Sequence, residues 1–189
     1  MHNGKTVICE VGVGPPGMAF GLLVLDQPNV HVMMFEPNRE YCEKLRAAIG
    51  ARENVELHQV AIGDELGTVD FYDEGTSSSL AGIASPSMQH KGAETARVSY
   101  PVQVCKISDY DHGQIDILRL DTEGSEWLCL KHLVSRPRQI VVEIYNNLAT
   151  YINPNLAEIV DWAVQNGYKL TGIHDSDFIY ELTQPAPSP

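Results

Sequence analysis

Hydrophobic residues recur along the chain in short β-branched runs, separated by stretches with apolar residues at helical spacing. Short apolar runs bounded by polar residues or glycine are typical of buried strands. The runs that predict a central sheet are Thr6–Val11, Val30–Phe35, Val55–Val60, Ile115–Leu120 and Ile140–Ile144. Because helical patterns lie between most of them, this order predicts an α/β fold whose mostly parallel sheet is covered by helices on both faces.

Three stretches carry an apolar stripe with helical period. Their apolar positions are Tyr41, Leu45, Ala48 and Ile49 in the first, Trp127, Leu130 and Val134 in the second, and Leu156, Ile159, Val160, Ala163 and Val164 in the third. Gly50 follows the first stripe and Gly167 the third, as glycine commonly does at the end of a helix. Asn155 and Glu158 have the spacing of a capping box at the start of the third helix.

Two pairs of strand-like runs depart from this alternation. Val69–Tyr72 and Val98–Val104 flank a polar Gly/Ser/Thr-rich segment, which predicts a hairpin or paired strands with a long loop, inserted before the fourth core strand. Within that segment, Gly75–Arg97 is a candidate lid, with a disordered insertion as the alternative. Tyr168–Thr171 and Phe178–Leu182 are joined by the short segment GIHDSD, so we expect them to be antiparallel, since a parallel pair needs a crossover.

The composition is that of an ordinary globular chain, with 43% hydrophobic and 20% charged residues in 189. We expect one domain over residues 1–184 and a disordered Pro-rich tail over 185–189. The formal net charge of −12, with scattered basic residues, argues against nucleic acid as a partner. The cysteines at 9, 42, 105 and 129 show no zinc-site or disulfide spacing, and no apolar run is long enough to span a membrane, so a cytoplasmic location is expected.

A glycine loop follows the first predicted strand. Residues 10–17 are EVGVGPPG, in which Gly12, Gly14 and Gly17 have the G-x-G-x-x-G spacing. A loop at this place lies at the carboxyl end of the sheet, where open α/β folds bind ligands. Glu36 ends the second strand about twenty residues later, where a carboxylate accepts hydrogen bonds from the two hydroxyls of a ribose. The glycine loop and Glu36 together predict a cofactor with an adenosine ribose. A tight turn that binds no ligand is the alternative for the loop.

Glu10 distinguishes between such cofactors. It lies in an otherwise apolar strand, where a buried carboxylate requires a donor or a positive charge. A pyrophosphate would be repelled, whereas the ammonium of an amino-acid moiety or a sulfonium would be attracted. Pro15 and Pro16 also remove two amide donors that a pyrophosphate would use. The loop therefore favours S-adenosylmethionine over NAD.

The chain resembles the FkbM family of S-adenosylmethionine-dependent methyltransferases in the blocks FEPN, VAIGDELG and LDTEGSE, and in their order and spacing. The resemblance implies a Rossmann-like class I fold, with a mostly parallel seven-stranded sheet and an antiparallel C-terminal strand. It implies methyl transfer, usually to an oxygen of a sugar, lipid-linked or natural-product acceptor. It implies cofactor contacts from Glu10, Gly12, Val13, Gly14, Glu36, Pro37, Ala61, Ile62, Asp64 and Asp121. The family commonly has a DVGAN-like loop where PPG stands here.

Three carboxylates are candidates for catalysis. By the resemblance, Asp121 and Glu123 would face the reactive methyl group, and either could remove a proton from an acceptor hydroxyl. Glu143 near the end of the fifth strand is a third candidate, with a core carboxylate paired with Arg119 as the alternative. Asp121 and Glu143 alone are a poor cation site because a third ligand is not evident, so no metal is expected.

A non-catalytic S-adenosylmethionine-binding module is one alternative, and an NAD-dependent oxidoreductase is a second. The expected partner is a small-molecule acceptor. Only MHNGK precedes the first strand, where many family members have covering helices, so a homodimer that covers the site is a reasonable expectation.

Overall fold

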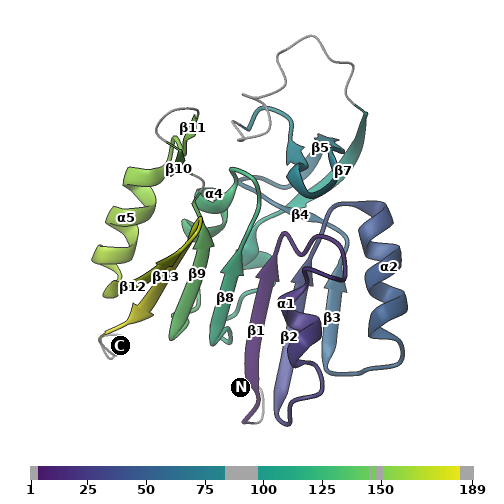
Figure 1. The fold of residues 1–189 in the computed structure, drawn as a ribbon, viewed down its shortest axis with the longest axis horizontal. Coiled ribbons are helices and arrows are strands. Elements are labelled where there is room, and N and C mark those ends of the chain that lie inside the picture. Colours follow the sequence, from purple (N-terminus) through teal and green to yellow (C-terminus); the bar gives the residue numbers. More distant parts are fainter. Residues whose placement is uncertain (1–3, 84–97, 145, 148–150, 184–189) are drawn as a thin grey trace.

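A seven-stranded sheet forms the centre of the molecule in a computed structural model that describes residues 4–83, 98–144, 146–147 and 151–183 (Figure 1). The strand order is β12-β13-β9-β8-β1-β2-β3. The strands are β1 Thr6–Val11, β2 Val30–Phe35, β3 Val55–His58, β8 Ile117–Leu120, β9 Gln139–Glu143, β12 Tyr168–His174 and β13 Asp177–Leu182. The strands from β9 to β3 are parallel, whereas β13 is antiparallel to both β9 and β12. The predicted α/β fold with a reversed C-terminal strand is confirmed.

Helices cover both faces of this sheet. They are α1 Phe20–Val24, α2 Arg39–Ile49, α4 Glu126–Leu130 and α5 Leu156–Gln165, with 3-10 turns η1 Gly75–Ser77 and η2 Ile107–Asp109. Alternate residues of β2 point to opposite faces: Met33 and Phe35 join the core under α4 and α5, and Val32 and Met34 join the core under α1 and α2. This double burial explains why the central strands are continuous apolar runs.

A second, four-stranded sheet lies beyond the carboxyl ends of the central strands (Figure 1). Its order is β4-β7-β5-β6, formed by Ala61–Ile62, Ser99–Cys105, Gly67–Tyr72 and Ser79–Leu80. The strands β5 and β7 are antiparallel, which confirms the predicted pairing before the fourth core strand. A short pair, β10 Asn146–Asn147 and β11 Tyr151–Ile152, completes the strands.

Some local predictions require correction. The helix predicted through Val134 ends at Leu130, and Val134 is 55% exposed. The Asn155 side chain does not cap α5; instead the Asn155 N–H donates to Asn153 Oδ1. The turn between β12 and β13 is shorter than predicted, because both strands extend toward each other. Residues 84–97 of the candidate lid and the tail 185–189 lie outside the described residues.

The start and end of α2 follow from its sequence. Asn38 precedes the helix, and its Oδ1 accepts a hydrogen bond from the Tyr41 N–H, which has no partner within the helix. Gly50 has a φ of 64° at the other end, a conformation that glycine adopts without steric penalty. This helix is therefore fixed directly behind the end of β2. Within the described residues, none of the helices has the length and apolar character needed to cross a membrane.

Candidate active site

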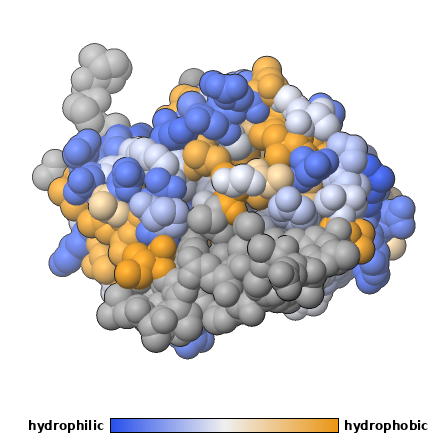
Figure 2. Space-filling view, turned by 90° about the horizontal axis from the view of Figure 1, so that it is seen from above, coloured by the Kyte–Doolittle hydropathy of each residue, from blue (hydrophilic) through white to orange (hydrophobic). Residues whose placement is uncertain are grey.

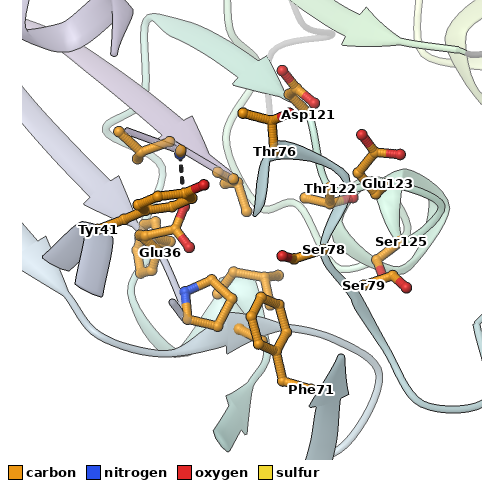
Figure 3. Close-up of a pocket in the computed structure, with 18 of the residues that line it drawn as sticks. Glu36, Tyr41, Phe71, Thr76, Ser78, Ser79, Asp121, Thr122, Glu123 and Ser125 are labelled. Carbon is orange, nitrogen blue, oxygen red and sulfur yellow. Dashed lines mark hydrogen bonds between the residues drawn. The ribbon is translucent and has the colours of Figure 1, made fainter. Parts of the chain in front are cut away.

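A pocket of about 700 Å³, including the space open to solvent at its mouth, lies at the carboxyl ends of β1, β2 and β8 (Figure 3). The second sheet supplies its opposite wall through Phe71, Ser79 and Leu80. Figure 2, which views this end of the molecule from above, shows hydrophobic patches interspersed with hydrophilic ones.

The glycine loop forms the wall of the pocket next to β8. Gly12 has a φ of 78°, and a Cβ at this position would lie 1.7 Å from the backbone oxygen of Asp121. Only glycine therefore permits the end of β1 to approach the end of β8 this closely. Gly14 also has a positive φ, 68°, but a Cβ there would meet no atom within 4 Å. The two glycines thus have different reasons to be glycine.

Glu36 joins the two loops that follow β1 and β2. Its Oε2 accepts a hydrogen bond from the Gly14 N–H, and its Oε1 accepts one from the Asn38 N–H, both at 2.7 Å. Only 4% of the residue is exposed, and this burial raises the pKa of Glu36, while the two N–H donors oppose the shift. Each carboxylate oxygen keeps acceptor capacity for a further donor.

Glu10 is 0% exposed and does not line the pocket. Its Oε1 and Oε2 accept hydrogen bonds from the Phe20 and Gly21 N–H groups, the free donors of the first turn of α1. Arg119 Nη1 donates to Glu10 Oε1 over 3.1 Å. The positive charge expected beside Glu10 is therefore supplied by Arg119 of the chain itself.

The acidic end of the pocket contains Asp121, Glu123 and Glu143. One carboxylate oxygen from each lies within 4.8 Å of the others. Burial, together with the hydrogen bond and charge of Glu143, raises the pKa of Asp121 to about 9, although Arg119 Nη2 lies 3.3 Å from Asp121 Oδ2. Burial and the charge of Glu143 raise the pKa of Glu123 to about 7. Protons are therefore bound in this cluster near neutral pH.

The loop after β8 holds Glu123 in an unusual backbone conformation. Its φ is 54°, and Gly124 follows with a φ of 114°. The buried Glu126 carboxylate fixes this loop, because its Oε1 accepts hydrogen bonds from the Thr122 and Gly124 N–H groups and from the Thr122 hydroxyl. A strained residue that its surroundings hold in place is characteristic of functional sites.

Beyond the glycine loop, Glu36 and the acidic end, the remaining wall of the pocket is mainly apolar. Its wall includes Pro37, Ala61, Ile62, Phe71 and Leu80. The carboxylate of Asp64 does not lie here. It pairs instead with Lys131 Nζ at 2.8 Å and His132 Nε2 at 2.7 Å, which lower the pKa of Asp64 to about 2.

The structure thus brings most of the predicted site residues to one pocket. These are Gly12, Val13, Gly14, Glu36, Pro37, Ala61, Ile62, Asp121 and Glu123. Glu143 lies beside Asp121 without lining the pocket, and Ser176 Oγ donates to its Oε1. Sequence reasoning did not assign Tyr41, Phe71, Leu80, Thr122 or Ser125 to the site. Tyr41 belongs to a helical apolar stripe, which gave no signal that it faces a ligand.

The same acidic end also has the ligand type that divalent cations prefer, since carboxylate oxygens are hard donors. From the sequence, only Asp121 and Glu143 were expected to meet. The structure adds Glu123 as a third carboxylate. A third carboxylate ligand is therefore present, contrary to the expectation from the sequence, but the neighbouring Arg119 guanidinium disfavours a second cation at Asp121.

Fold and site together define the class of protein. The parallel sheet with a reversed C-terminal strand carries a pocket at the ends of β1, β2 and β8, as in class I, Rossmann-like, S-adenosylmethionine-dependent methyltransferases. The chain belongs to the methyltransferase FkbM domain family, whose model matches residues 18–170. This family match favours the methyltransferase over the oxidoreductase interpretation of the glycine loop.

Curated relatives match only part of the chain. It is 34% identical over 76 residues to a probable D-serine dehydratase of Aeromonas salmonicida and 33% identical over 76 residues to the D-serine dehydratase of Citrobacter koseri. Each match covers 40% of this chain and spans 17% of the length of the relative.

Solved structures of methyltransferases align with most of the chain at low sequence identity. Precorrin-6y C5,15-methyltransferase from Geobacter metallireducens is 13% identical, with a TM-score of 0.48 over 93% of this chain and 79% of the other. A methyltransferase from Pyrococcus furiosus is 15% identical, with a TM-score of 0.45 over 96% of this chain and 77% of the other.

Proposed function

We propose that this domain transfers the methyl group of S-adenosylmethionine to a hydroxyl oxygen of a small-molecule acceptor of the sugar, lipid-linked or natural-product kind. The observation that carries the proposal is the arrangement of one pocket. Glu36 lies on one side of it, and the acidic residues Asp121 and Glu123 lie on another (Figure 3). The glycine loop contacts both sides, because the Gly14 N–H donates to Glu36 and Gly12 closely approaches the Asp121 backbone oxygen.

Glu36 is the ribose-binding residue in this proposal. Its oxygens are already oriented by two N–H groups, and each can accept a further hydrogen bond from one hydroxyl of the ribose. Gly12, Val13 and Gly14 contact the methionine part, while Pro37, Ala61 and Ile62 contact the adenine. Glu10 contributes indirectly, because its contacts with α1 and Arg119 hold the loop and the end of β8 in place.

Glu123 is the base in this proposal. When bound, the cofactor supplies an electrophilic methyl group; the acceptor oxygen forms the new bond to this carbon as the bond from carbon to sulfur breaks. Glu123 takes the hydroxyl proton, for which its pKa of about 7 is well suited. Asp121, whose carboxyl proton is shared with Glu143 near neutral pH, orients the acceptor by accepting a hydrogen bond from a further hydroxyl group.

The mouth of the pocket favours an acceptor with both polar and apolar parts. Met18 and Pro15 line it, and Met18 is 55% exposed. Hydroxyl groups of the acceptor bind the acidic end, while its apolar portion contacts Met18.

A homodimer that covers this mouth is also part of the proposal. Size-exclusion chromatography with light scattering measures the oligomeric state, and a monomer at micromolar concentration would contradict the dimer.

Calorimetric titration with S-adenosylmethionine, S-adenosylhomocysteine and NADH tests the cofactor assignment. We expect both adenosyl compounds to bind, and Glu36→Ala to weaken them by about 100-fold or more, since it removes two hydrogen bonds to a charged group. Glu40→Ala is the matched control, because Glu40 is exposed on α2 and pairs only with Lys44 among the contacts in the described residues. Binding of NADH alone, or of none of the three, would refute the assignment.

Release of S-adenosylhomocysteine in the presence of hydroxylated acceptors tests catalysis separately. Glycosides, polyprenyl-linked sugars and polyketides form a suitable panel. Binding without turnover on any of them, at several pH values, would instead indicate a non-catalytic cofactor-binding module.

A further inference from the structure

Two serine hydroxyls of the pocket wall have no hydrogen-bond partner in the part of the chain that the structure describes. Ser79 in β6 is 2% exposed, and Ser125 before α4 is 1% exposed. The Oγ atoms of both are buried and unpaired, and both residues line the pocket. Figure 3 shows them on the side of the pocket away from Glu36 and Tyr41.

The neighbouring Ser78 is different. It also lines the pocket, but its Oγ donates to the Gly75 carbonyl oxygen over 2.6 Å and accepts from the Glu74 N–H over 2.9 Å. Its hydroxyl therefore stabilises the turn around η1. Buried hydroxyls in native proteins nearly always have a partner, so two unpaired ones in one pocket indicate that a ligand supplies the partner.

The surroundings indicate the chemistry of that ligand group. Ser79 is followed by Leu80, and the same wall contains Phe71, Ala61 and Ile62, which suit the flat face of an aromatic ring. A serine hydroxyl can donate one hydrogen bond and accept up to two. The edge of adenine presents an exocyclic amine as donor and ring nitrogens as acceptors, so a pair of hydroxyls matches it.

We propose that Ser79 and Ser125 recognise the edge of the adenine ring and make this pocket selective for adenine over hypoxanthine. Rotation about the Cα–Cβ bond, between staggered positions, turns each hydroxyl from the wall toward the base. The hairpin insertion that carries β6 thus supplies part of the base-recognition site. This inference rests on the proposed binding of S-adenosylmethionine in the same pocket.

Titration with S-adenosylhomocysteine and S-inosylhomocysteine tests the proposal. We expect the unmodified protein to prefer the adenine compound by about tenfold or more, and Ser79→Ala and Ser125→Ala each to weaken its binding about tenfold and to reduce the preference. Ser99→Ala is the control, because Ser99 is exposed on β7 and does not line the pocket, and we expect this variant to retain the preference.

Thermal unfolding separates a binding role of the serines from a structural one, because the two roles predict different changes in the Tm of the unliganded protein. Removing an unpaired buried hydroxyl, as in Ser79→Ala or Ser125→Ala, should leave the Tm of the unliganded protein unchanged or raise it, while the ligand-induced rise in Tm becomes smaller. A purely structural serine would instead lower the unliganded Tm. Equal binding of both compounds by the unmodified protein would overturn the role of the serines and leave the pocket assignment intact. Binding of neither compound would refute the proposed function itself.

Discussion

Glu10 and Arg119 are register partners in the parallel strands β1 and β8, and Arg119 Nη1 donates to Glu10 Oε1 over 3.1 Å. The pair connects the sheet to the first turn of α1, since the same carboxylate accepts from the Phe20 and Gly21 N–H groups. Removing one partner of such a pair leaves the other charge buried without compensation. The connection is therefore structural, and it positions the glycine loop.

Glu10→Ala is expected to destabilise the protein by about 3–5 kcal/mol, because it leaves two N–H groups without their acceptor and removes one of the two carboxyl groups that pair with Arg119. Glu10→Gln keeps one acceptor oxygen and should be milder. Urea unfolding followed by circular dichroism measures both, with the exposed Glu40→Ala as control, which should change stability by less than about 0.5 kcal/mol. Unchanged stability of Glu10→Ala together with lost cofactor binding would restore the direct cofactor contact inferred from the sequence.

Gly12 and Gly14 offer a matched comparison in one loop. Gly14→Ala introduces only a left-handed alanine, which is unfavourable by about 1–2 kcal/mol. Gly12→Ala adds a Cβ that would lie 1.7 Å from the Asp121 backbone oxygen, so the ends of β1 and β8 must separate. We expect a much larger loss of unfolding free energy for Gly12→Ala in the same denaturation assay. Equal effects would mean that the loop moves freely away from β8.

The rate of methyl transfer is expected to rise with pH through an apparent pKa of about 7. Glu123 has a pKa raised to about 7, so it is protonated below this pH and becomes available as a base above it. A pH profile of kcat/KM on any active acceptor measures the effect, because kcat/KM reports the pKa values of the free enzyme. Glu123→Gln should lower kcat by about 10²–10⁴-fold and abolish this limb. A profile with the same midpoint in the variant would assign the limb to another group.

Stability supplies an independent check on the same carboxyl group. Folding raises the pKa of Glu123 from 4.5 to about 7. The favourable contribution of this carboxyl group to the free energy of unfolding is therefore complete below pH 4.5 and is lost as the pH rises through 7. Glu123→Gln should therefore gain stability relative to the unmodified protein between pH 5 and pH 8, by at most about 3 kcal/mol.

Asp64→Ala is expected to leave cofactor affinity unchanged within about twofold. The resemblance to the FkbM family placed Asp64 by the adenine, but its carboxylate pairs with Lys131 and His132 on the outer surface. Calorimetric titration with S-adenosylhomocysteine measures the affinity, and Ile62→Ala, which alters the pocket wall, provides the contrasting case. A loss of affinity at Asp64 comparable with that of Ile62→Ala would show that its side chain turns toward the base.

Chelation of divalent cations is expected to leave methyl transfer unaffected. The Arg119 guanidinium lies 3.3 Å from Asp121 and provides positive charge at the acidic end, which opposes binding of a second cation. Activity before and after dialysis against EDTA, with Mg²⁺ or Mn²⁺ restored, measures the effect. Loss of activity on dialysis and recovery with the ion would assign Asp121, Glu123 and Glu143 as metal ligands.

Local patterns predicted the sheet well, because its strands are apolar on both faces and end at turn residues. The bounds of β1 and β2 agree with the prediction, and α2 ends at Gly50 as expected. The partner of Glu10 was not predictable in the same way. Arg119 is 109 positions away, and only the pairing of β1 with β8 brings the two together.

The part of the cofactor pocket that lies at the ends of the predicted strands was also predictable from the sequence. Glu36 and Gly14 follow strands whose carboxyl ends share one edge, so their proximity follows from fold class alone. The contributions of Phe71 and Leu80 depend on how the second sheet folds over that edge, which no periodicity encodes. Ser125 carried no signal because a single serine at the start of a helix usually serves as a cap.

The Glu36 carboxylate is held by N–H groups from two different loops before any ligand arrives. A side chain fixed in this way has little rotational freedom left to lose on complex formation, so most of the entropic penalty at this contact is already incurred during folding. Association should then proceed close to rigid-body docking. The contribution of Glu36 to affinity would then lie chiefly in a slower dissociation rate of the nucleoside.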